Sequence, residues 1–459
     1  MILANLQNTD FESLFRAYDI RGIFNKQLTE KKAAAIGDGI ARFVGEGVEV
    51  VVGRDVRLSG ESLRNALVSG LISGCNVTDI GVVSTPMLYF ATNHLKQKAG
   101  IMITASHNPP EWNGFKLFKP NGCIYGEEMT RIKQFASSAN VKGGLDSKHG
   151  KLANYDRILQ DYADFVSSKI RVIQKLKVVA DTANGVCGLF APLLFERQGC
   201  EILTLNQTPD GRFPAHLPEP KESTLGELKQ KVLEAKADFG VGYDGDGDRA
   251  VFIDDTGRLI PGDLALLLFA ADVLERSRGA KVVYELSCSM AVEEYVKAHG
   301  GQPLVEKVGH TFIMDKMISE SAALGGEKSG HFYFADTHGG DDAIFASLRM
   351  AEILAKSDKK LSTLFDALPH YPSIFEENFP CPDHMKFKVL KKLKAKLEAE
   401  DQNLLGVDGI KILDDNGWVL LRPSNTEAII RVSAEAKNKE KLKELYDFAA
   451  RELKQIMTE

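Results

Sequence analysis

Three aspartates at alternate positions have the spacing of a metal-binding loop. Single glycines separate Asp244, Asp246 and Asp248, and Arg249 follows them. Because glycine lets the backbone turn tightly, the three carboxylates can converge on one hard cation such as Mg²⁺, and their repulsion would be costly without one. An EF-hand calcium loop is excluded, since Arg249 and Asp255 stand where that loop needs glycine and glutamate. We therefore expect a Mg²⁺ site, not a solvated turn, with Arg249 helping to hold a phosphate beside the metal.

A serine follows a short apolar run that predicts a buried strand over residues 101–104. His107, Asn108 and two prolines come next and must turn the chain out of the sheet. This places Ser106 at the carboxyl edge of a strand, where open α/β sheets bind their ligands. A Ser-His pair by itself is usually an ordinary turn, so a catalytic role for Ser106 depends on the metal-type and anion-binding loops elsewhere in the chain.

Two further loops have the chemistry to bind a phosphate and a sugar. Residues 422–427, Arg-Pro-Ser-Asn-Thr-Glu, offer a guanidinium, hydroxyls, an amide and backbone N–H groups, which suit a phosphate, although a capped turn with a surface arginine is an open alternative. Residues 325–331 place Glu327 and Ser329 two positions apart, which suits adjacent hydroxyls of a sugar. His331 ends that loop and is either a proton carrier or a structural residue.

The N-terminal motifs are less specific. Arg21 could reach a phosphate. We expect Arg54, Asp55 and Arg57 to form a structural ion-pair network beneath the active-site loop. His310, after a predicted strand, has no role that its sequence context alone assigns.

The composition excludes several classes of protein. The chain has 459 residues, of which 44% are hydrophobic and 26% charged, and its formal net charge is −6. No broad attraction to nucleic acid or to an anionic membrane is expected, so phosphate affinity must come from local loops. The six scattered cysteines form no CxxC pair and indicate reduced thiols. With no signal-peptide pattern and no apolar run long enough to span a bilayer, we expect a cytoplasmic protein, a monomer or alternatively a dimer.

The elements that must position these loops alternate between strand and helix in three cycles of about 100 residues. Apolar strand signals lie at residues 48–52, 101–104, 178–180, 239–243, 250–253, 281–284 and 304–308. Such strands between helices are typical of a parallel sheet covered on both faces. From about residue 369 the pattern changes to a helix with a solvated lysine-rich face (385–399), two strands and a terminal helix. We predict an α/β fold, with three similar α/β domains that have mixed, mainly parallel sheets, and a smaller C-terminal α+β domain, over residues 1–150, 151–254, 255–368 and 369–459.

Together, these stretches resemble the α-D-phosphohexomutase family, and most closely its bacterial phosphomannomutase/phosphoglucomutase members. The motifs that carry the resemblance, in the order of the family, are residues 104–109, 244–249, 326–331 and 422–427. The resemblance runs from Tyr18 to about Val432. It implies three similar α/β domains and a smaller C-terminal domain around a deep central cleft.

The resemblance also implies an enzyme, an intramolecular phosphotransferase that carries a phosphoserine. Ser106 passes its phosphate to a hexose 1-phosphate, and the resulting hexose 1,6-bisphosphate turns over in the cleft and returns its other phosphate, which leaves a hexose 6-phosphate. The implied Mg²⁺ ligands are Ser106, Asp244, Asp246 and Asp248. The implied catalytic residues are Ser106, His107, Lys116, Arg249 and His331. The implied substrate-binding residues are Tyr18, Arg21, His310, Glu327, Ser329, Arg422, Ser424, Asn425, Thr426 and Arg431.

The preferred sugar depends on smaller features. Residues 112–116 and 424–426 resemble the enzymes of mannose and glucose phosphates, whereas phosphoglucosamine mutases usually carry glycine in place of Asn425. Ser287 stands where close relatives usually have a lysine facing the cleft, which leaves mannose, glucose and glucosamine phosphates open. A metal-dependent sugar phosphatase and a non-catalytic sugar-phosphate-binding protein are the alternatives. Separate loops for a sugar and a distal phosphate favour the mutase, because only a reorienting bisphosphate needs both.

Overall fold

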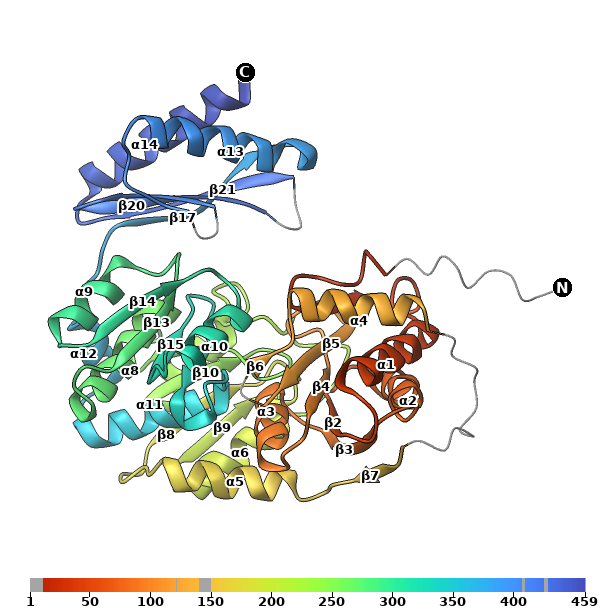
Figure 1. The fold of residues 1–459 in the computed structure, drawn as a ribbon. Coiled ribbons are helices and arrows are strands. Elements are labelled where there is room, and N and C mark those ends of the chain that lie inside the picture. Colours follow the sequence, from red (N-terminus) through yellow and green to blue (C-terminus); the bar gives the residue numbers. More distant parts are fainter. Residues whose placement is uncertain (1–10, 121, 140–149, 407–408, 425–427, 459) are drawn as a thin grey trace.

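The computed structural model describes residues 11–120, 122–139, 150–406, 409–424 and 428–458. It contains four sheets, which follow one another along the chain. The first three lie together in one body, and the fourth stands above them (Figure 1). All six cysteines are buried and free, as the sequence predicts. Among the helices of the described ranges, none combines the length and the apolar character that crossing a membrane would require.

The first sheet is mixed and has seven strands in the order β1-β5-β4-β2-β3-β7, with β6 paired to β5. The strands are β1 (Asp19–Ile23), β2 (Glu49–Arg54), β3 (Asn76–Val82), β4 (Ala99–Ile103), β5 (Trp112–Lys119), β6 (Gly122–Cys123) and β7 (Leu152–Asn154). The helices are α1 (Glu30–Val44), α2 (Gly60–Leu71), α3 (Thr85–His94) and α4 (Glu127–Ser137). Along β2, Val50 and Val52 pack with α1, α2 and α4, while Val51 packs with α3, as the alternation of side chains along a strand requires. Both faces of the sheet are therefore covered.

Two glycines allow α1 and α2 to pack closely. A Cβ atom on Gly37 would lie 2.2 Å from the Leu67 carbonyl oxygen, and one on Gly70 would lie 2.0 Å from the Ala34 carbonyl oxygen. No side chain fits at either position, so the two helix backbones touch there.

The second and third sheets share one hydrophobic core with α3 of the first. The second has the order β12-β11-β10-β8-β9 and is built from β8 (Lys177–Asp181), β9 (Glu201–Leu205), β10 (Phe239–Tyr243), β11 (Ala250–Asp254), β12 (Leu259–Ile260), α5 (Ile158–Lys169), α6 (Cys187–Arg197) and α7 (Gly226–Ala235). The third has the order β14-β13-β15-β16 and is built from β13 (Lys281–Glu285), β14 (Gln302–Glu306), β15 (Leu324–Gly326), β16 (Phe332–Phe334), α8 (Gly262–Arg276), α9 (Met290–Ala298), α10 (His310–Ser319), the short helix η1 (Ala335–Thr337), α11 (Ala343–Ser357) and α12 (Leu361–Asp366).

One strand begins and ends two residues earlier than its prediction. The apolar run predicted a strand over 304–308, but β14 spans Gln302–Glu306. It pairs in parallel with every residue of β13, beginning at Lys281 opposite Gln302. Gly309, with a φ of 131°, then turns the chain into α10, so the last predicted residues belong to a loop.

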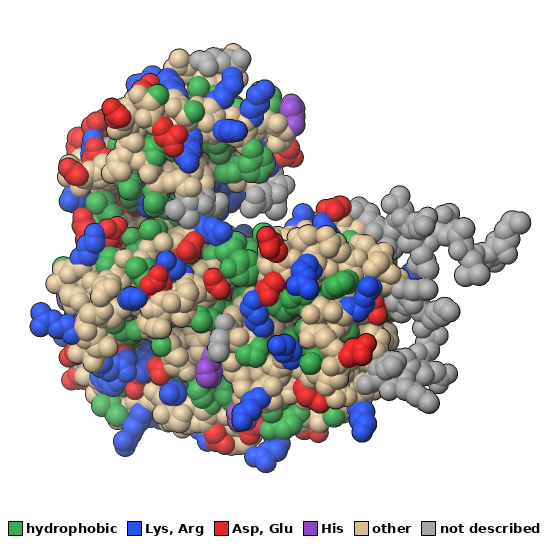
Figure 2. Space-filling view, in the orientation of Figure 1, with side chains coloured by type: hydrophobic (Ala, Val, Ile, Leu, Met, Phe, Trp, Pro, Cys, Tyr) green, Lys and Arg blue, Asp and Glu red, His purple; other side chains and the backbone are tan. Residues whose placement is uncertain are grey.

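The fourth sheet is antiparallel, with the order β17-β21-β20-β19-β18. Its elements are β17 (Ser373–Pro380), β18 (Leu404–Leu405), β19 (Ile410–Asp414), β20 (Gly417–Pro423), β21 (Ile429–Ala436), α13 (Asp383–Ala399) and α14 (Lys439–Thr458). Both helices cover the face that points away from the other sheets (Figure 1). We call each sheet with its helices a unit, numbered in the order of the sheets. The surface is hollowed between the fourth unit and the first (Figure 2).

Each loop that the sequence singles out follows a strand. The loop of Ser106 follows β4, the aspartate loop follows β10, the loop of Glu327 follows β15, and Ser424 follows β20. Loops at the carboxyl ends of strands form the ligand-binding edge of an α/β sheet. The fold therefore presents four polar loops from four separate sheets.

Candidate active site

A cavity of about 560 Å³ opens where the first, second and third sheets meet. Its wall carries most of the predicted site residues, namely Tyr18, Arg21, Ser106, His107, Lys116, Asp248, Arg249, His310, Glu327, Ser329 and His331. It also carries Arg16, Asn108 and Trp112, which are not among the predicted site residues. Asp244 and Asp246 are buried behind this wall and contact Ser106 and Lys116. Three further predicted residues belong to the fourth sheet and are not on this wall: Arg422, Ser424 and Arg431.

Ser106 follows β4 with its backbone in the left-handed region, at a φ of 50°. This conformation is strained for a residue with a side chain, so surrounding contacts must hold it. The Ser106 N–H donates to Thr104 Oγ1 at 2.9 Å, and the Ser106 hydroxyl donates to Asp244 Oδ2 at 2.8 Å. His107 Nδ1 lies 3.1 Å from the same hydroxyl. The serine hydroxyl thus meets a carboxylate of the aspartate loop and an imidazole.

A buried arginine supports the Ser106 loop from beneath. Arg57 donates to the carbonyl oxygens of residues 106, 108, 109 and 112 at 2.7, 2.6, 2.7 and 2.9 Å. Its Nε lies 3.2 Å from Asp55 Oδ2, and Asp55 accepts the Thr104 hydroxyl at 2.7 Å. The predicted ion-pair network is therefore confirmed for Asp55 and Arg57, whereas Arg54 forms no ion pair within the described ranges.

Replacing Arg57 by methionine is expected to lower the free energy of unfolding by about 3–5 kcal/mol, because the buried Asp55 carboxylate loses its cation. It should also lower kcat by about 10- to 100-fold, since the strained Ser106 loop loses its support. Thermal unfolding and steady-state kinetics measure the two effects. Arg54→Met breaks no ion pair and is the matched control. Equal effects of the two substitutions would contradict this role of Arg57.

The three aspartates converge as their glycine spacing predicts. One oxygen from each lies within 4.8 Å of the others, and all three side chains are fully buried. Asp244 Oδ1 accepts the backbone N–H groups of residues 247, 248 and 249, which fold the loop around it. Thr85, the first residue of α3, donates its hydroxyl to Asp246 Oδ2 at 2.6 Å. Groups from the first and second units thus fix the orientation of the carboxylates.

Lys116 adds a cation to the aspartates. Its Nζ lies 2.9 Å from Asp246 Oδ2 and also contacts Asp248. Burial alone would lower the pKa of Lys116, but the two carboxylates outweigh burial and raise it. Burial and the neighbouring carboxylates raise the pKa of Asp244. At Asp246 and Asp248 burial acts in the same direction, but Lys116 and other nearby groups together outweigh it. These groups are hydrogen bonds from Asp244 and Thr85 at Asp246, and His331 and Arg249 at Asp248, and the pKa of each carboxyl falls.

The donor set suits a divalent cation. The Oδ1 atoms of Asp246 and Asp248 are buried and have no hydrogen-bond partner in the described parts of the chain. Hard cations prefer carboxylate and hydroxyl oxygens, and Ser106 adds a hydroxyl beside Asp244. The acidic loop is therefore able to hold a metal ion next to the serine.

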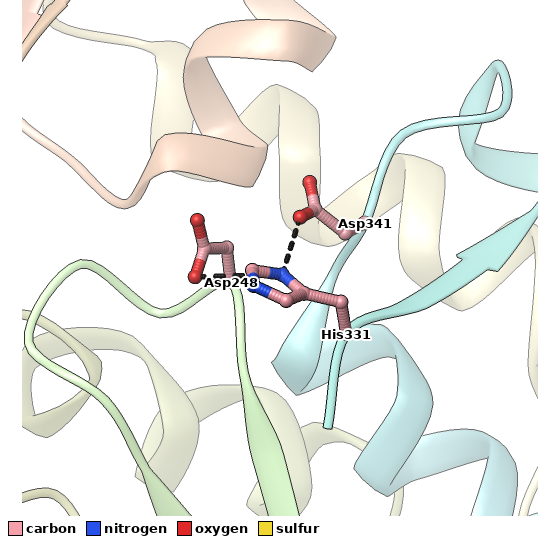
Figure 3. A group of neighbouring side chains, drawn as sticks. All are labelled: Asp248, His331 and Asp341. Carbon is pink, nitrogen blue, oxygen red and sulfur yellow. Dashed lines mark hydrogen bonds and ion pairs between the residues drawn. The ribbon is translucent and has the colours of Figure 1, made fainter. Parts of the chain in front are cut away.

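Arg249 and His331 meet at the cavity wall. Arg249 Nε donates to His331 Nε2 at 2.8 Å, and His331 Nδ1 lies 2.6 Å from Asp341 Oδ2 (Figure 3). Burial lowers the pKa of His331, but Asp248 and the hydrogen bond to Asp341 outweigh burial and raise it. The hydrogen bond from Arg249 nevertheless requires a neutral His331 ring, because only an unprotonated Nε2 accepts a hydrogen bond.

The N-terminal strand contributes two of the predicted residues. Arg21 donates to Asp19 Oδ2 at 2.7 Å and to Asn108 Oδ1 at 2.6 Å, which ties β1 to the Ser106 loop. The Tyr18 ring packs edge-on against His310, with 5.0 Å between the ring centroids. Arg21 therefore joins two parts of the first unit, whereas Tyr18 connects that unit with the third.

The predicted sugar loop faces the same cavity. Glu327 accepts the Tyr333 hydroxyl at 2.5 Å and the Gly309 N–H at 3.3 Å, and burial raises the pKa of Glu327. Ser329 lines the wall beside it. His310 is buried, and neither ring nitrogen has a hydrogen-bond partner within the described residues. Burial lowers the pKa of His310 to about 4, so the ring is neutral and has one donor and one acceptor.

The fourth sheet carries the predicted phosphate loop. Ser424 is buried at the end of β20, and Arg422 pairs across strands with Arg431 on β21. Arg431 also forms an ion pair with Glu376 at 3.0 Å. Two members of the predicted set lie outside the described residues, Asn425 and Thr426. The described residues thus place two arginines opposite each other on neighbouring strands, with Ser424 two residues after the first of them.

Sequence reasoning missed several residues that support the site. Lys386 of α13 was predicted on a solvated face, but it is buried and its Nζ contacts the Ser424 carbonyl oxygen. Thr85 and Asp341 also had no signal, because each acts through a contact with a distant part of the chain. Ser287, the departure from close relatives, donates its hydroxyl to Glu285 Oε1 at 2.6 Å within its own loop.

Comparisons with known proteins agree with this arrangement. Residues 12–140, 160–257 and 261–371 match the alpha/beta/alpha domains I, II and III of phosphoglucomutase/phosphomannomutase, and residues 376–452 match the C-terminal domain. A phosphomannomutase/phosphoglucomutase of Pseudomonas putida is 38% identical over 98% of this chain and 97% of that protein. A probable phosphoglucosamine mutase of Methanothermobacter thermautotrophicus is 36% identical over 95% of this chain and 96% of that protein. A phosphoglucomutase/phosphomannomutase family protein from Burkholderia thailandensis, solved by X-ray crystallography, aligns with a TM-score of 0.89 and 34% identity over 97% of this chain and 98% of that one.

Proposed function

The chain belongs to the phosphoglucomutase/phosphomannomutase family, and we propose that this phosphohexomutase interconverts the 1- and 6-phosphates of mannose and glucose through a phosphoserine at Ser106. One observation carries the proposal. The Ser106 hydroxyl donates to Asp244 at 2.8 Å, on the wall of the same cavity that presents Glu327 and Ser329. A nucleophile beside metal-type carboxylates suits phosphoryl transfer, and the polar groups of the third unit suit a sugar.

In the first half of the proposed reaction, a hydroxyl oxygen of hexose 1-phosphate attacks the phosphorus on Ser106. A P–O bond forms on the sugar as the bond to Ser106 Oγ breaks. The hydroxyl proton passes to His331, which the sequence offers as a proton carrier and which lines the same cavity. Ser106 Oγ takes up a proton from solvent, relayed by the neutral ring of His107, which leaves a hexose 1,6-bisphosphate and a free serine.

The second half reverses these transfers after the bisphosphate turns over. Ser106 Oγ attacks the other phosphate and gives its proton to His107 Nδ1, 3.1 Å away. Arg249 and burial hold the pKa of His107 well below its usual range, so the ring is neutral and able to accept that proton. His331 returns its proton to the departing sugar oxygen, which completes hexose 6-phosphate.

Positive charge stabilises both transfers. Arg249 lines the cavity and Lys116 holds its proton between Asp246 and Asp248, so each places a cation beside the transferring phosphoryl group. Mg²⁺ bound by Ser106 and the three aspartates would neutralise further charge on that group. Lys116, which the resemblance implies for proton transfer, acts here through its charge.

A mutase must also hold the phosphate that is not being transferred. We assign this task to the loop of the fourth unit, through Arg422, Ser424 and Arg431 together with Asn425 and Thr426. The residues that then contact the sugar between the two phosphates are Tyr18, Arg21, His310, Glu327 and Ser329. A phosphatase would need no such distal loop, which favours the mutase.

The proposal predicts the products of a ³¹P NMR experiment. The protein is mixed with Mg²⁺, a trace of hexose 1,6-bisphosphate and, in turn, mannose, glucose or glucosamine 1-phosphate. We expect the 6-phosphate resonance to appear without inorganic phosphate, fastest with mannose or glucose. The strongest rate with glucosamine 1-phosphate would favour a phosphoglucosamine mutase, the alternative that Ser287 leaves open. Inorganic phosphate without isomerisation would mean hydrolysis and overturn the mutase.

A further inference from the structure

A second cavity, of about 510 Å³, adjoins the catalytic one, and we call it the outer cavity. Residues of α4 border it on one side, and Lys307 and Phe312 border it on the other, so it lies between the first and third units (Figure 1). Arg16 and Ala17 line both cavities. The two cavities therefore meet at these two residues.

The backbone at this border is held on both sides. The Arg16 N–H donates to the Asp19 carbonyl oxygen at 2.8 Å, which closes a tight turn before β1. The Gly126 N–H, just before α4, donates to the Ala17 carbonyl oxygen at 3.3 Å. This turn therefore keeps Arg16 at the border between the catalytic cavity and the outer cavity.

Positive charge predominates on the wall of the outer cavity. The charged residues of this wall are Arg16, Glu127, Lys133 and Lys307. Lys133 is already paired with Glu12, at 2.8 Å, but Arg16 and Lys307 form no ion pair within the described residues. The Lys307 ammonium lies over the Phe312 ring, 3.7 Å from its centroid, which fixes its place on this wall. Two cations are therefore available there to an anionic ligand.

Aromatic rings continue from the outer cavity into the catalytic one. Tyr125 and Phe312 line the outer cavity, with 5.7 Å between their ring centroids. The Phe312 ring is 5.8 Å from that of Tyr18, which lines the catalytic cavity and packs against His310. Sites for small ligands typically combine such aromatic surface with a few charged groups. A sugar phosphate that moves from one cavity to the other thus stays against one continuous wall.

The proposed reaction needs a site of this kind. When hexose 1,6-bisphosphate turns over, one phosphate leaves the surroundings of Ser106 and the other leaves the loop of the fourth unit. We propose that Arg16 and Lys307 hold one phosphate of the bisphosphate in the outer cavity during this turnover, so that the intermediate stays on the protein. No bond is made or broken there. This inference rests on the proposed function, because the ligand is the intermediate of that reaction.

The wall of the outer cavity offers matched variants for a test. Arg16 is exposed and Lys307 is half-buried, so Arg16→Met and Lys307→Met remove a charge without disturbing the hydrophobic core. Lys133→Met is the control, because Lys133 lines the same cavity but has Glu12 as its partner. Arg16→Lys keeps the positive charge and tests whether charge or shape matters.

The experiment measures how often the intermediate escapes. Protein that carries ³²P on Ser106 is mixed with Mg²⁺, excess glucose 1-phosphate and unlabelled glucose 1,6-bisphosphate, which prevents rebinding of labelled intermediate. Label in glucose 6-phosphate then counts completed turnovers, and label in free glucose 1,6-bisphosphate counts escapes. Arg16→Met and Lys307→Met should each raise the ratio of escapes to completed turnovers by about tenfold, because each removes one charge-assisted contact with phosphate.

The control variants should behave differently. We expect Lys133→Met to change this ratio less than about twofold, and Arg16→Lys to raise it less than about threefold. An unchanged ratio in both Arg16→Met and Lys307→Met, or an equal rise in Lys133→Met, would overturn the proposal. A higher KM for glucose 1-phosphate with an unchanged ratio would also overturn it, since the site would then capture incoming substrate. If the wild type transferred no label from Ser106 to sugar, the proposed function itself would be wrong.

Discussion

Ser106→Ala is expected to lower turnover by at least about 10⁴-fold and to abolish labelling of the protein by phosphate. The reason is that the proposed reaction forms and breaks a P–Oγ bond twice in each cycle, and no other hydroxyl takes that place. Intact-protein mass spectrometry after incubation with hexose 1,6-bisphosphate measures the label as one added phosphate. ³¹P NMR with hexose 1-phosphate measures turnover. Of all the substitutions considered, this one should have the largest effect.

The control for this prediction is a nearby serine outside the cavity. Ser59 is also buried, and its hydroxyl accepts the Asn113 side-chain N–H at 2.8 Å. Ser59→Ala should therefore lose about 1 kcal/mol of stability from one hydrogen bond but keep its phosphate label. If Ser106→Ala still took up phosphate, or still isomerised hexose phosphate at the wild-type rate, Ser106 would not be the nucleophile.

The local patterns predicted the Ser106 loop and the aspartate loop separately, and the family resemblance implied that the two loops meet. Glycines at alternate positions identify a loop that can gather carboxylates, and an apolar run before Ser106 identifies the strand that ends there. In the structure the loops after β4 and β10 meet, with 2.8 Å between Ser106 Oγ and Asp244 Oδ2. Position relative to strands was therefore enough to find the central residues.

The supporting contacts could not be predicted in the same way. Thr85, Lys386 and Asp341 are ordinary residues in their own stretches of sequence, and each acquires its role only when a distant segment packs against it. Lys386 is the clearest case, since a lysine in a lysine-rich helix predicts exposure, but its Nζ reaches a carbonyl oxygen of the phosphate loop. Tertiary contacts of this kind override the pattern of the helix itself.

The fold shows the same limit. Most apolar runs appear as strands close to their predicted bounds, and 239–243 matches β10 fully. β14 lies two residues before the predicted run because it pairs along its whole length with β13. This pairing involves a distant segment and leaves no signal in residues 304–308 themselves. The positive φ of Ser106 also had no signal, because Arg57 and Thr104, from outside the turn, hold that conformation.

Lys116→Met is the second substitution with a large expected effect. It leaves the buried Asp246 and Asp248 carboxylates without their ammonium partner, and breaking a buried ion pair on one side costs about 3–5 kcal/mol. We expect that loss of unfolding free energy in EDTA, and a loss of at least about 100-fold in kcat with Mg²⁺, because a charge beside the phosphoryl group is gone. Thermal and denaturant unfolding, each with and without Mg²⁺, provide the measurements.

The dependence on pH and metal distinguishes this effect from a packing defect. Lys116 lowers the pKa values of Asp246 and Asp248, whereas burial raises them. In Lys116→Met the two buried carboxylates therefore take up protons at a higher pH than in the wild type, and their repulsion is relieved as the pH falls. The stability difference between Lys116→Met and the wild type in EDTA should therefore be larger at pH 8 than at pH 4.

A matched control lies on the same strand. Lys119→Met removes an exposed ion pair with Glu128, worth about 0–1 kcal/mol, and should respond to neither pH nor metal beyond the wild type. If Mg²⁺ replaces part of the lost charge, it should raise the Tm of Lys116→Met more than that of the wild type or of Lys119→Met. Equal Mg²⁺ responses in all three proteins would mean that the metal does not bind against Asp246 and Asp248. In that case the acidic loop would need Lys116 alone to balance its charge, and the proposed Mg²⁺ site would be wrong.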